Sequence, residues 1–396
     1  MQKSICKDIM QLATRVVLII TPLIAMDTPT VNVGLRIAHA RILLKLTQDQ
    51  VCEAMGFKDR QTLSDIETGK RAVKSEELSK FSDVLDQEYD FFLDPFSVVA
   101  EAQYSWRASE DVPKEVLDSF QARAGGWVGM LRWLRAQAPA GYSPLGFSLR
   151  LDSNSTYEQA QSKAEQLVEQ LQLGTVPSLK LAECIEKKLD IPVLFVDAET
   201  KSAPGTISGA ACHMAELGVI LVNRRESAAR RNFDLAHELF HTLTWEQIKP
   251  VYRESNSIEE RKRTRRVEQL ADNFAGALLM PRSSLDALID PARRKDVQHL
   301  ADVAAQLRVS VTALSWRLKV LGRIDDATRE NLARVRRPDA AAELPKPFSE
   351  SFVKQLHVAL DKGRVTARKA ARTLGLPLHE LASLFTVYEL SDPFRS

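Results

Sequence analysis

Apolar residues recur with the period of a helix in four short segments near the start of the chain. They are VGLRIAHARILL (33–44), LTQDQVCEAMGF (46–57), RQTLSDIETG (60–69) and ELSKFSDVLDQEYDFFLDP (77–95). Thr47 stands where a helix N-cap is expected, and Gly56 and Gly69 stand where helices end. Short helices separated by such turns predict an all-α helix-turn-helix domain over residues 31–95.

The periodic pattern weakens over residues 96–150, which we interpret as a connecting region. Two amphipathic helical segments follow, at 157–174 and 178–189, and then two β-branched runs that are typical of strands, IPVLFV (191–196) and LGVILVN (217–223). The helical segment FDLAHELFHTLTW comes next. Helices around a small sheet predict an α+β domain over residues 151–325.

The last part of the chain is helical again. The segments LADVAAQLRVSVTALSWRLKVLG (300–322) and VTARKAARTLGLPLHELASLF (365–385) each predict a helix, a turn and a second helix. Between them, RRPDAAAELPKP has the composition of a linker. We therefore expect a multi-domain chain in which residues 326–396 form a helical C-terminal region of unknown role.

Charge and cysteine content narrow the possible classes of protein. The 396 residues carry a formal net charge of only +2, so any surface that binds nucleic acid must be local. The four cysteines Cys6, Cys52, Cys184 and Cys212 lie far apart and include no CxxC pair. This spacing excludes a disulfide framework and a thiolate metal site, and it favours a cytoplasmic protein.

The first thirty residues superficially resemble a signal peptide. Lys3, Lys7 and Arg15 precede the apolar run VVLIITPLIAM (16–26), which is shorter than the roughly 20 residues that span a bilayer. Pro22 interrupts the run, and no small-residue cleavage site follows it. We expect residues 1–30 to be a disordered or artefactual extension, with Met26 as an alternative start and no membrane association.

Two histidines in FDLAHELFHTLTW point to metal chemistry. His237 and His241 are four residues apart, so on a helix their imidazoles lie on one face and can converge on one ion. Zinc accepts such nitrogen ligands. Glu238 is turned by about 100° from His237 and can act as a general base beside the metal instead of binding it. An alternative is that both histidines are ordinary core residues.

A catalytic zinc needs a third protein ligand, and the best candidate lies in RRVEQLADNFAGALLMP (265–281). Glu268 shares a helix face with small residues, which lets that helix approach the histidines closely. Asp272 lies one turn later and is placed to accept a hydrogen bond from the outer N–H of a ligating histidine. The combination of HExxH with ExxxD favours a metal site over core histidines.

The segment RRNFDLAHELFHTLTW, followed 27 residues after His241 by EQLADNFAGALLMP, resembles the ImmA/IrrE family of zinc metallopeptidases. The ExxxD arrangement is similar to that of thermolysin-like gluzincins, and the resemblance covers roughly residues 155–325. It implies that His237, His241 and Glu268 bind Zn²⁺ and that Glu238 activates a metal-bound water for peptide hydrolysis. Members of this family cleave or inactivate repressor proteins, often under stress.

The segments TQDQVCEAMGF and RQTLSDIETGKR resemble the Xre family of helix-turn-helix regulators. In that family a structural salt bridge joins the positions held here by Arg41 and Glu67. The segment between Gly56 and Glu67 is one residue longer in this chain than in the usual pattern of that family. Gln and Arg suit bidentate reading of adenine and guanine. The base readers that we expect are Arg60 and Gln61, and the phosphate-binding residues are Gln48, Ser64 and Lys70.

Local charge limits how tightly this module alone can bind DNA. Residues 31–75 carry eight basic and five acidic side chains, a net +3, and the next twenty residues turn this to −3. We therefore expect a homodimer to be required for tight binding to operator DNA.

The function that we predict is a transcriptional regulator whose zinc-dependent endopeptidase domain hydrolyses a repressor- or antitoxin-like protein, or its own chain. The alternative is a non-catalytic regulator or antitoxin that uses the peptidase fold as a sensing or partner-binding scaffold. If GVILVN formed an exposed sheet edge, it could bind an extended substrate by strand addition. His213 is a weaker candidate for an oxyanion donor, and a structural role is the alternative.

Overall fold

The computed structural model describes residues 32–137, 149–198, 204–248, 258–335 and 343–392. The chain divides into two units, one comprising residues 1–97 and 135–141 and the other residues 98–134 and 142–396. The extension predicted over residues 1–30 and the thiol of Cys6 lie outside the described residues.

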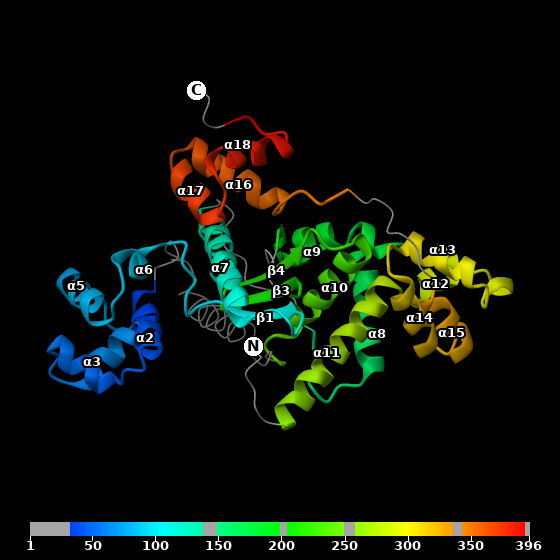
Figure 1. Ribbon diagram of the computed structural model, residues 1–396, viewed down its shortest axis with the longest axis horizontal. Coiled ribbons are helices and arrows are strands. Elements are labelled where there is room, and N and C mark those ends of the chain that lie inside the picture. Colours follow the sequence, from blue (N-terminus) through cyan, green and yellow to red (C-terminus); the bar gives the residue numbers. More distant parts are fainter. Residues whose placement is uncertain (1–31, 138–148, 199–203, 249–257, 336–342, 393–396) are drawn as a thin grey trace, which may run out of the picture. The chain divides into compact units, whose positions relative to one another are not determined.

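The first unit is a set of short helices (Figure 1). They are α2 (Val33–Leu43), α3 (Gln48–Met55), α4 (Arg60–Glu67), α5 (Ser75–Val84) and α6 (Tyr89–Leu93). Thr47 caps α3 by accepting a hydrogen bond from the backbone N–H of Gln50, and Gly56 ends α3 with φ +73°. The predicted helix-turn-helix is therefore confirmed, with α4 as its second helix.

Close packing of α2 on α4 depends on a glycine. A Cβ atom on Gly34 would lie 2.0 Å from the carbonyl oxygen of Ile66, so no larger residue fits there without moving a helix. The core between the helices contains Ile37, Val51 and Phe81 among other apolar residues. The predicted salt bridge is also confirmed, because Arg41 Nε lies 2.6 Å from Glu67 Oε1.

The second unit contains a four-stranded sheet in the order β1-β3-β4-β2. Its strands are β1 (Gln103–Ala108), β2 (Val193–Val196), β3 (Ile207–Met214) and β4 (Leu217–Asn223). β3 pairs antiparallel with both β1 and β4, and β2 pairs parallel with β4. The sequence correctly predicted β2 and β4 but neither β1 nor β3.

Two expectations need correction. β4 lies between β3 and β2, so it is not the exposed edge that we considered for strand addition. Residues 96–150 are also more than a connecting region, because β1 belongs to the sheet and residues 98–134 belong to the second unit. The domain boundaries at 95, 150 and 325 stay predictions.

Helices cover the sheet and extend the second unit (Figure 1). Their bounds are α7 (Lys114–Ala136), α8 (Tyr157–Leu171), α9 (Leu181–Leu189), α10 (Ala228–Thr244), α11 (Ile258–Leu279), α12 (Arg282–Leu288), α13 (Val297–Leu307), α14 (Val311–Val320), α15 (Asp326–Ala333), α16 (Glu350–Asp361), α17 (Ala367–Leu374) and α18 (Leu378–Val387). α10 packs between the strands β3 and β4 and the helix α11, and α11 packs against α8. The α+β unit with a helical C-terminal part is confirmed.

α7 joins β1 to the C-terminal helices. Trp106 on β1 donates a hydrogen bond from Nε1 to Gln121 on α7, and Trp127 on α7 donates one to the carbonyl oxygen of Leu374 at the end of α17. A Cβ atom on Gly126 would lie 2.9 Å from the carbonyl oxygen of Thr373. Among the described residues, no helix has the length and apolarity that a membrane span requires.

Candidate metal centre

α10 carries the two histidines into the interior of the second unit. Ser227 caps its first turn by accepting a hydrogen bond from the backbone N–H of Arg230. Leucines at helical spacing pack this helix against the sheet and α11, and the same packing buries the polar side chains between them. His237, Glu238 and His241 are therefore only 1–2% exposed.

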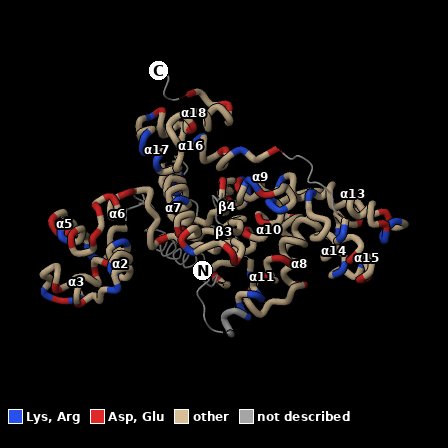
Figure 2. The backbone as a smooth tube through the Cα atoms, viewed as in Figure 1, with Lys and Arg blue, Asp and Glu red and all other residues tan. Residues whose placement is uncertain are grey.

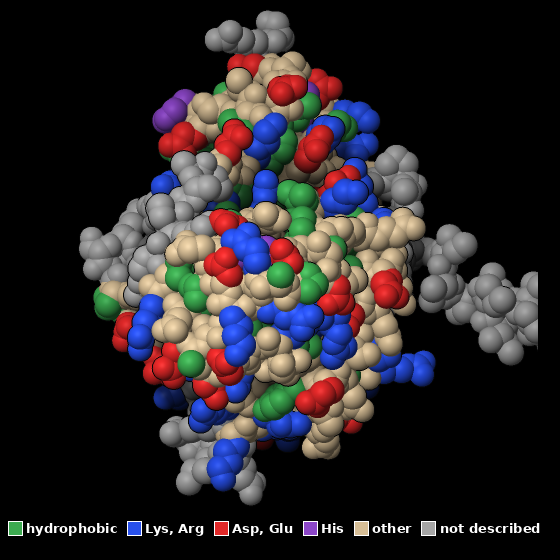
Figure 3. Space-filling view, turned by 90° about the vertical axis from the view of Figure 1, so that its right-hand side faces the viewer, with side chains coloured by type: hydrophobic (Ala, Val, Ile, Leu, Met, Phe, Trp, Pro, Cys, Tyr) green, Lys and Arg blue, Asp and Glu red, His purple; other side chains and the backbone are tan. Residues whose placement is uncertain are grey.

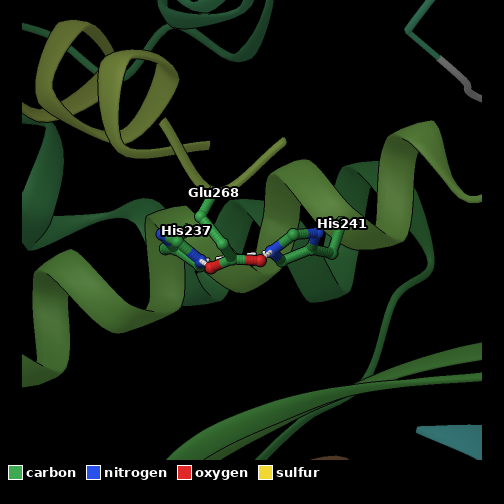
Figure 4. A group of neighbouring side chains, drawn as sticks. All are labelled: His237, His241 and Glu268. Carbon is green, nitrogen blue, oxygen red and sulfur yellow. Dashed lines mark hydrogen bonds and ion pairs between the residues drawn. The ribbon is translucent and has the colours of Figure 1, made fainter. Parts of the chain in front are cut away.

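The nitrogen and oxygen atoms of the three predicted ligands face one another (Figure 4). His237 Nε2 lies 3.1 Å from His241 Nε2 and 3.1 Å from Glu268 Oε2, and His241 Nε2 lies 3.4 Å from Glu268 Oε1. Zinc holds nitrogen at about 2.0–2.1 Å, so two tetrahedral nitrogen ligands are roughly 3.3 Å apart. The observed spacing fits one shared ion.

These three residues are the group among the described residues whose geometry suits a metal ion, with ligand atoms all within 4.8 Å of one another. Desolvation alone would raise the pKa of Glu268, but hydrogen bonds with His237 and His241 outweigh it and hold that pKa well below its usual range. An ionised carboxylate between two imidazoles is a suitable oxygen ligand.

Glu238 lies next to the three candidate ligands but, unlike them, makes no side-chain hydrogen bond within the described part of the chain. Neither of its carboxylate oxygens has a hydrogen-bond partner among the described residues. Burial raises the pKa of Glu238 to about 8, against the opposing influence of His241 and Arg107. A buried carboxyl without a partner costs free energy, and such groups are concentrated at functional sites.

A glycine on β3 lies beside Glu238, and close approach of β4 requires it. A Cβ atom on Gly209 would lie 3.7 Å from Glu238 Cγ and only 2.6 Å from the carbonyl oxygen of Leu221. Sequence reasoning missed Gly209, because its importance depends on the pairing of β3 with β4 and on the packing of α10 across that pair.

Two side chains approach the outer nitrogen of His237. Asp272 Oδ1 lies 2.9 Å from His237 Nδ1, which is the position predicted for Asp272, and Arg107 Nη1 lies 2.6 Å from the same nitrogen. Desolvation would raise the pKa of Asp272, but its hydrogen bond with His237 outweighs this and lowers the pKa. His241 Nδ1 has no hydrogen-bond partner among the described residues.

Sequence reasoning also missed Arg107, which lies on β1, 130 residues before His237. The alternation in QYSWRA was a usable signal for a strand. No signal indicated that this strand pairs with β3, since pairing between distant segments leaves no local pattern.

A cavity of about 800 Å³ adjoins the cluster and extends between α8, α10, α11 and α14. Asp272 lines it together with apolar side chains that include Phe233, Met280 and Trp316. Trp316 is 54% exposed, which is unusual for so large an apolar residue. His213 lies elsewhere, stacked on Trp245 and 3.3 Å from Glu246 Oε1, which favours the structural role.

In the first unit, the predicted DNA-contacting residues lie on α3, along α4 and just after it. Arg60 donates a hydrogen bond to Gln48, and Gln48 donates one to Glu67. Gln61 donates one to Asp65, and Arg60, Gln61 and Lys70 are exposed while Ser64 is half-buried. These bonds order Gln48, Arg60 and Gln61 without burying Arg60 or Gln61.

Charged residues are distributed differently on α5 and α6 and on one face of the second unit. Figure 2 shows acidic residues gathered on α5 and α6, away from the predicted recognition helix in sequence. On the face of the second unit that carries α13–α15, basic and acidic side chains are interspersed (Figure 3). That face has no extended surface of one sign for a nucleic acid.

Comparison with known families agrees with the division of the chain into two units. Residues 186–319 match the family model described as the IrrE N-terminal-like domain, and residues 37–92 match the helix-turn-helix model. The first match includes α10 and α11 but not β1. No curated protein and no solved structure matches the chain.

Proposed function

We propose that this chain is a DNA-binding regulator whose second unit hydrolyses a protein, because residues 37–92 match a helix-turn-helix model and residues 186–319 match the IrrE N-terminal-like domain. His237, His241 and Glu268 would hold Zn²⁺. The observation that carries the proposal is the convergence of these three ligands beside the unpartnered carboxylate of Glu238.

Each residue of the cluster has a distinct part in the proposed reaction. A bound zinc ion supplies a Lewis acid that activates water and polarises the scissile carbonyl. The carboxylate of Glu238 would take a proton from the attacking water and deliver it to the leaving amine. Asp272 accepts the Nδ1 proton of His237 and so presents Nε2 to the ion.

The substrate that we propose is a repressor- or antitoxin-like protein, or the chain itself. The apolar cavity beside Asp272 would accept a large apolar side chain of that substrate. Because β4 is internal and β1 ends the sheet, an extended segment added near the site would pair with β1. We place the protein in the cytoplasm, where such partners act.

The first unit would direct the protein to operator DNA. We propose that Arg60 and Gln61 read bases in the major groove and that Gln48, Ser64 and Lys70 contact phosphates. Exposure of Arg60, Gln61 and Lys70 supports these roles. A homodimer would double the number of contacts with DNA. Tight binding requires this, because the net positive charge of one module is small.

The near-complete burial of His237, Glu238 and His241 favours a second candidate function. In that alternative the domain is a non-catalytic scaffold that senses a ligand or binds a partner, and the protein is itself the regulator or antitoxin. The unpartnered Glu238 supports catalysis instead, since a scaffold gains nothing from a buried carboxyl without a hydrogen bond.

Metal content of the purified full chain tests the proposal directly. Elemental analysis should find about one zinc per chain in the wild type and little in His241→Ala or Glu268→Ala. Glu238→Gln should keep its zinc but cleave no protein encoded beside it, whereas the wild type cleaves one. Zinc-free wild-type protein would refute the metal site, and metal-loaded protein without any cleavage would favour the scaffold.

A further inference from the structure

Arg107 reaches the candidate metal centre from outside the matched domain. It lies on β1, opposite Gly209 of β3, and Gly209 is the residue that Glu238 packs against. Arg107 Nη1 lies 2.6 Å from His237 Nδ1 and 3.6 Å from Asp272 Oδ1, and Arg107 Nε lies 2.8 Å from Asp234 Oδ1. One guanidinium therefore meets a candidate ligand and two carboxylates.

Asp234 shows why a cation is needed at this place. Its side chain is fully buried one turn before His237 on α10, and its ion-pair partners are Arg107 and Arg230. Arg230 is 47% exposed while Arg107 is 20% exposed, so Arg107 is the better shielded of the two. A buried carboxylate without such partners would be strongly destabilising.

We propose that Arg107 is a positioning residue of the metal centre. By pairing with Asp234 and Asp272, it holds in place the carboxylate that accepts the Nδ1 proton of His237. With that nitrogen protonated, Arg107 acts on His237 through Asp272 and not through a hydrogen bond of its own. Partners behind a ligating histidine set its ring orientation and commonly change metal affinity by about 10- to 100-fold. This inference rests on the proposed function, because it assumes that His237 is a ligand.

The inference also gives β1 a role in the site. The main segment of the first unit ends at Ser97, and β1 begins at Gln103. The strand that follows the DNA-binding unit in the chain thus carries a residue on which metal binding depends.

Zinc dissociation constants of the full chain, measured by competition with a chelator, test the proposal. Arg107→Ala should bind zinc about 10- to 100-fold more weakly than the wild type. Arg107→Lys should fall between them, because an ammonium keeps the charge but lacks the planar guanidinium that pairs with both Asp234 and Asp272. The matched control is Arg323→Ala, because Arg323 is similarly shielded and pairs with Asp286, which lies outside the metal centre. The zinc affinity of this variant should equal that of the wild type.

A double-mutant cycle separates positioning from a general effect on folding. If Arg107 acts through Asp272, the combined variant Arg107→Ala/Asp272→Asn should lose less affinity than the product of the two single losses. Independent losses, or wild-type affinity in a folded Arg107→Ala protein, would overturn the proposal. So would an unfolded Arg107→Ala protein together with wild-type affinity in Arg107→Lys. Failure of the proposed function itself is distinguishable, because the wild type would then bind no zinc.

Discussion

Two buried charged residues of the first unit, Arg36 and Glu67, contrast with Glu238 of the second unit. In the first unit, Arg36 is fully buried and donates hydrogen bonds to four backbone carbonyl oxygens at 2.7 to 3.3 Å, and Glu67 accepts hydrogen bonds from Arg41 and Gln48. In the second unit, the carboxylate of Glu238 is equally inaccessible and has no hydrogen-bond partner among the described residues.

The presence or absence of hydrogen-bond partners distinguishes buried charges that stabilise the fold from buried groups that serve catalysis or binding. A buried charge with a full set of partners holds elements together, and removing it leaves the partners unsatisfied. A buried group without partners costs stability, so a fold keeps it only where it contributes something else. In the first unit the proposed base readers Arg60 and Gln61 are accordingly exposed, whereas in the second unit His237, Glu238 and His241 are buried.

The largest effect on stability should come from Arg36. Arg36→Ala leaves four carbonyl oxygens around α6 without their donor, so we expect a loss of about 3–5 kcal/mol in the free energy of unfolding of the first unit. Hydrogen exchange of α3 and α4 amides in the full chain measures this loss. Lys80→Ala, an exposed change on α5, should alter exchange by no more than about 0.5 kcal/mol. Equal exchange in both variants would contradict the structural role of Arg36.

Surface residues of the same unit should affect DNA binding and not stability. With a duplex selected from a random-sequence library, Gln61→Ala should weaken binding by about 1–3 kcal/mol and relax the preference at one base pair. Lys70→Ala should weaken binding to all sequences and reduce the salt dependence by about one charge. Fluorescence anisotropy at several salt concentrations measures both effects. A uniform loss in Gln61→Ala would mean that Gln61 reads no base.

The sequence was sufficient wherever the controlling interactions are local. The spacing of His237 and His241 fixes their common face on any helix, and Thr47 and Gly56 act on the turns next to them. Arg107 and Gly209 could not be found in this way. Their role depends on β1 pairing with β3, and a strand of six residues contains no information about its partner.

The same limit explains the incorrect edge strand. The β-branched run at 217–223 predicted a strand correctly, but whether a strand lies at the edge or the centre depends on which others pair with it. The predicted Arg41–Glu67 salt bridge was reliable because it came from the resemblance to a family, in which the pairing is already part of the pattern.

Removing the unpartnered carboxylate should cost the second unit little. In zinc-free protein, we expect Glu238→Gln to be at least as stable as the wild type. Burial raises the pKa of Glu238, which costs folding free energy at neutral pH, whereas a neutral amide has no charge to lose on burial. Asp234→Asn is the matched variant on the same helix. Burial raises the pKa of Asp234 too, but Asp234 has ion-pair partners, and Asp234→Asn should lower the stability because it leaves Arg107 and Arg230 without that carboxylate. Thermal unfolding with a chelator present compares them. Equal losses would show that Glu238 has a structural role after all.

The smallest effect concerns a partnered carboxylate near the surface of the first unit. A hydrogen bond from Arg71 lowers the pKa of Glu77, and the N–H of Lys74 adds to this. A folded-state pKa below the unfolded value of about 4.3 stabilises the folded unit above that pH. The stabilisation is lost as the pH falls through the lower folded-state value. Glu77→Gln should therefore be less stable than the wild type at pH 7, and the difference should vanish toward pH 3. Hydrogen exchange of α5 amides in both proteins, compared at matched pH, measures this difference. A difference that stayed constant with pH would mean that the ionised carboxylate does not stabilise the helix.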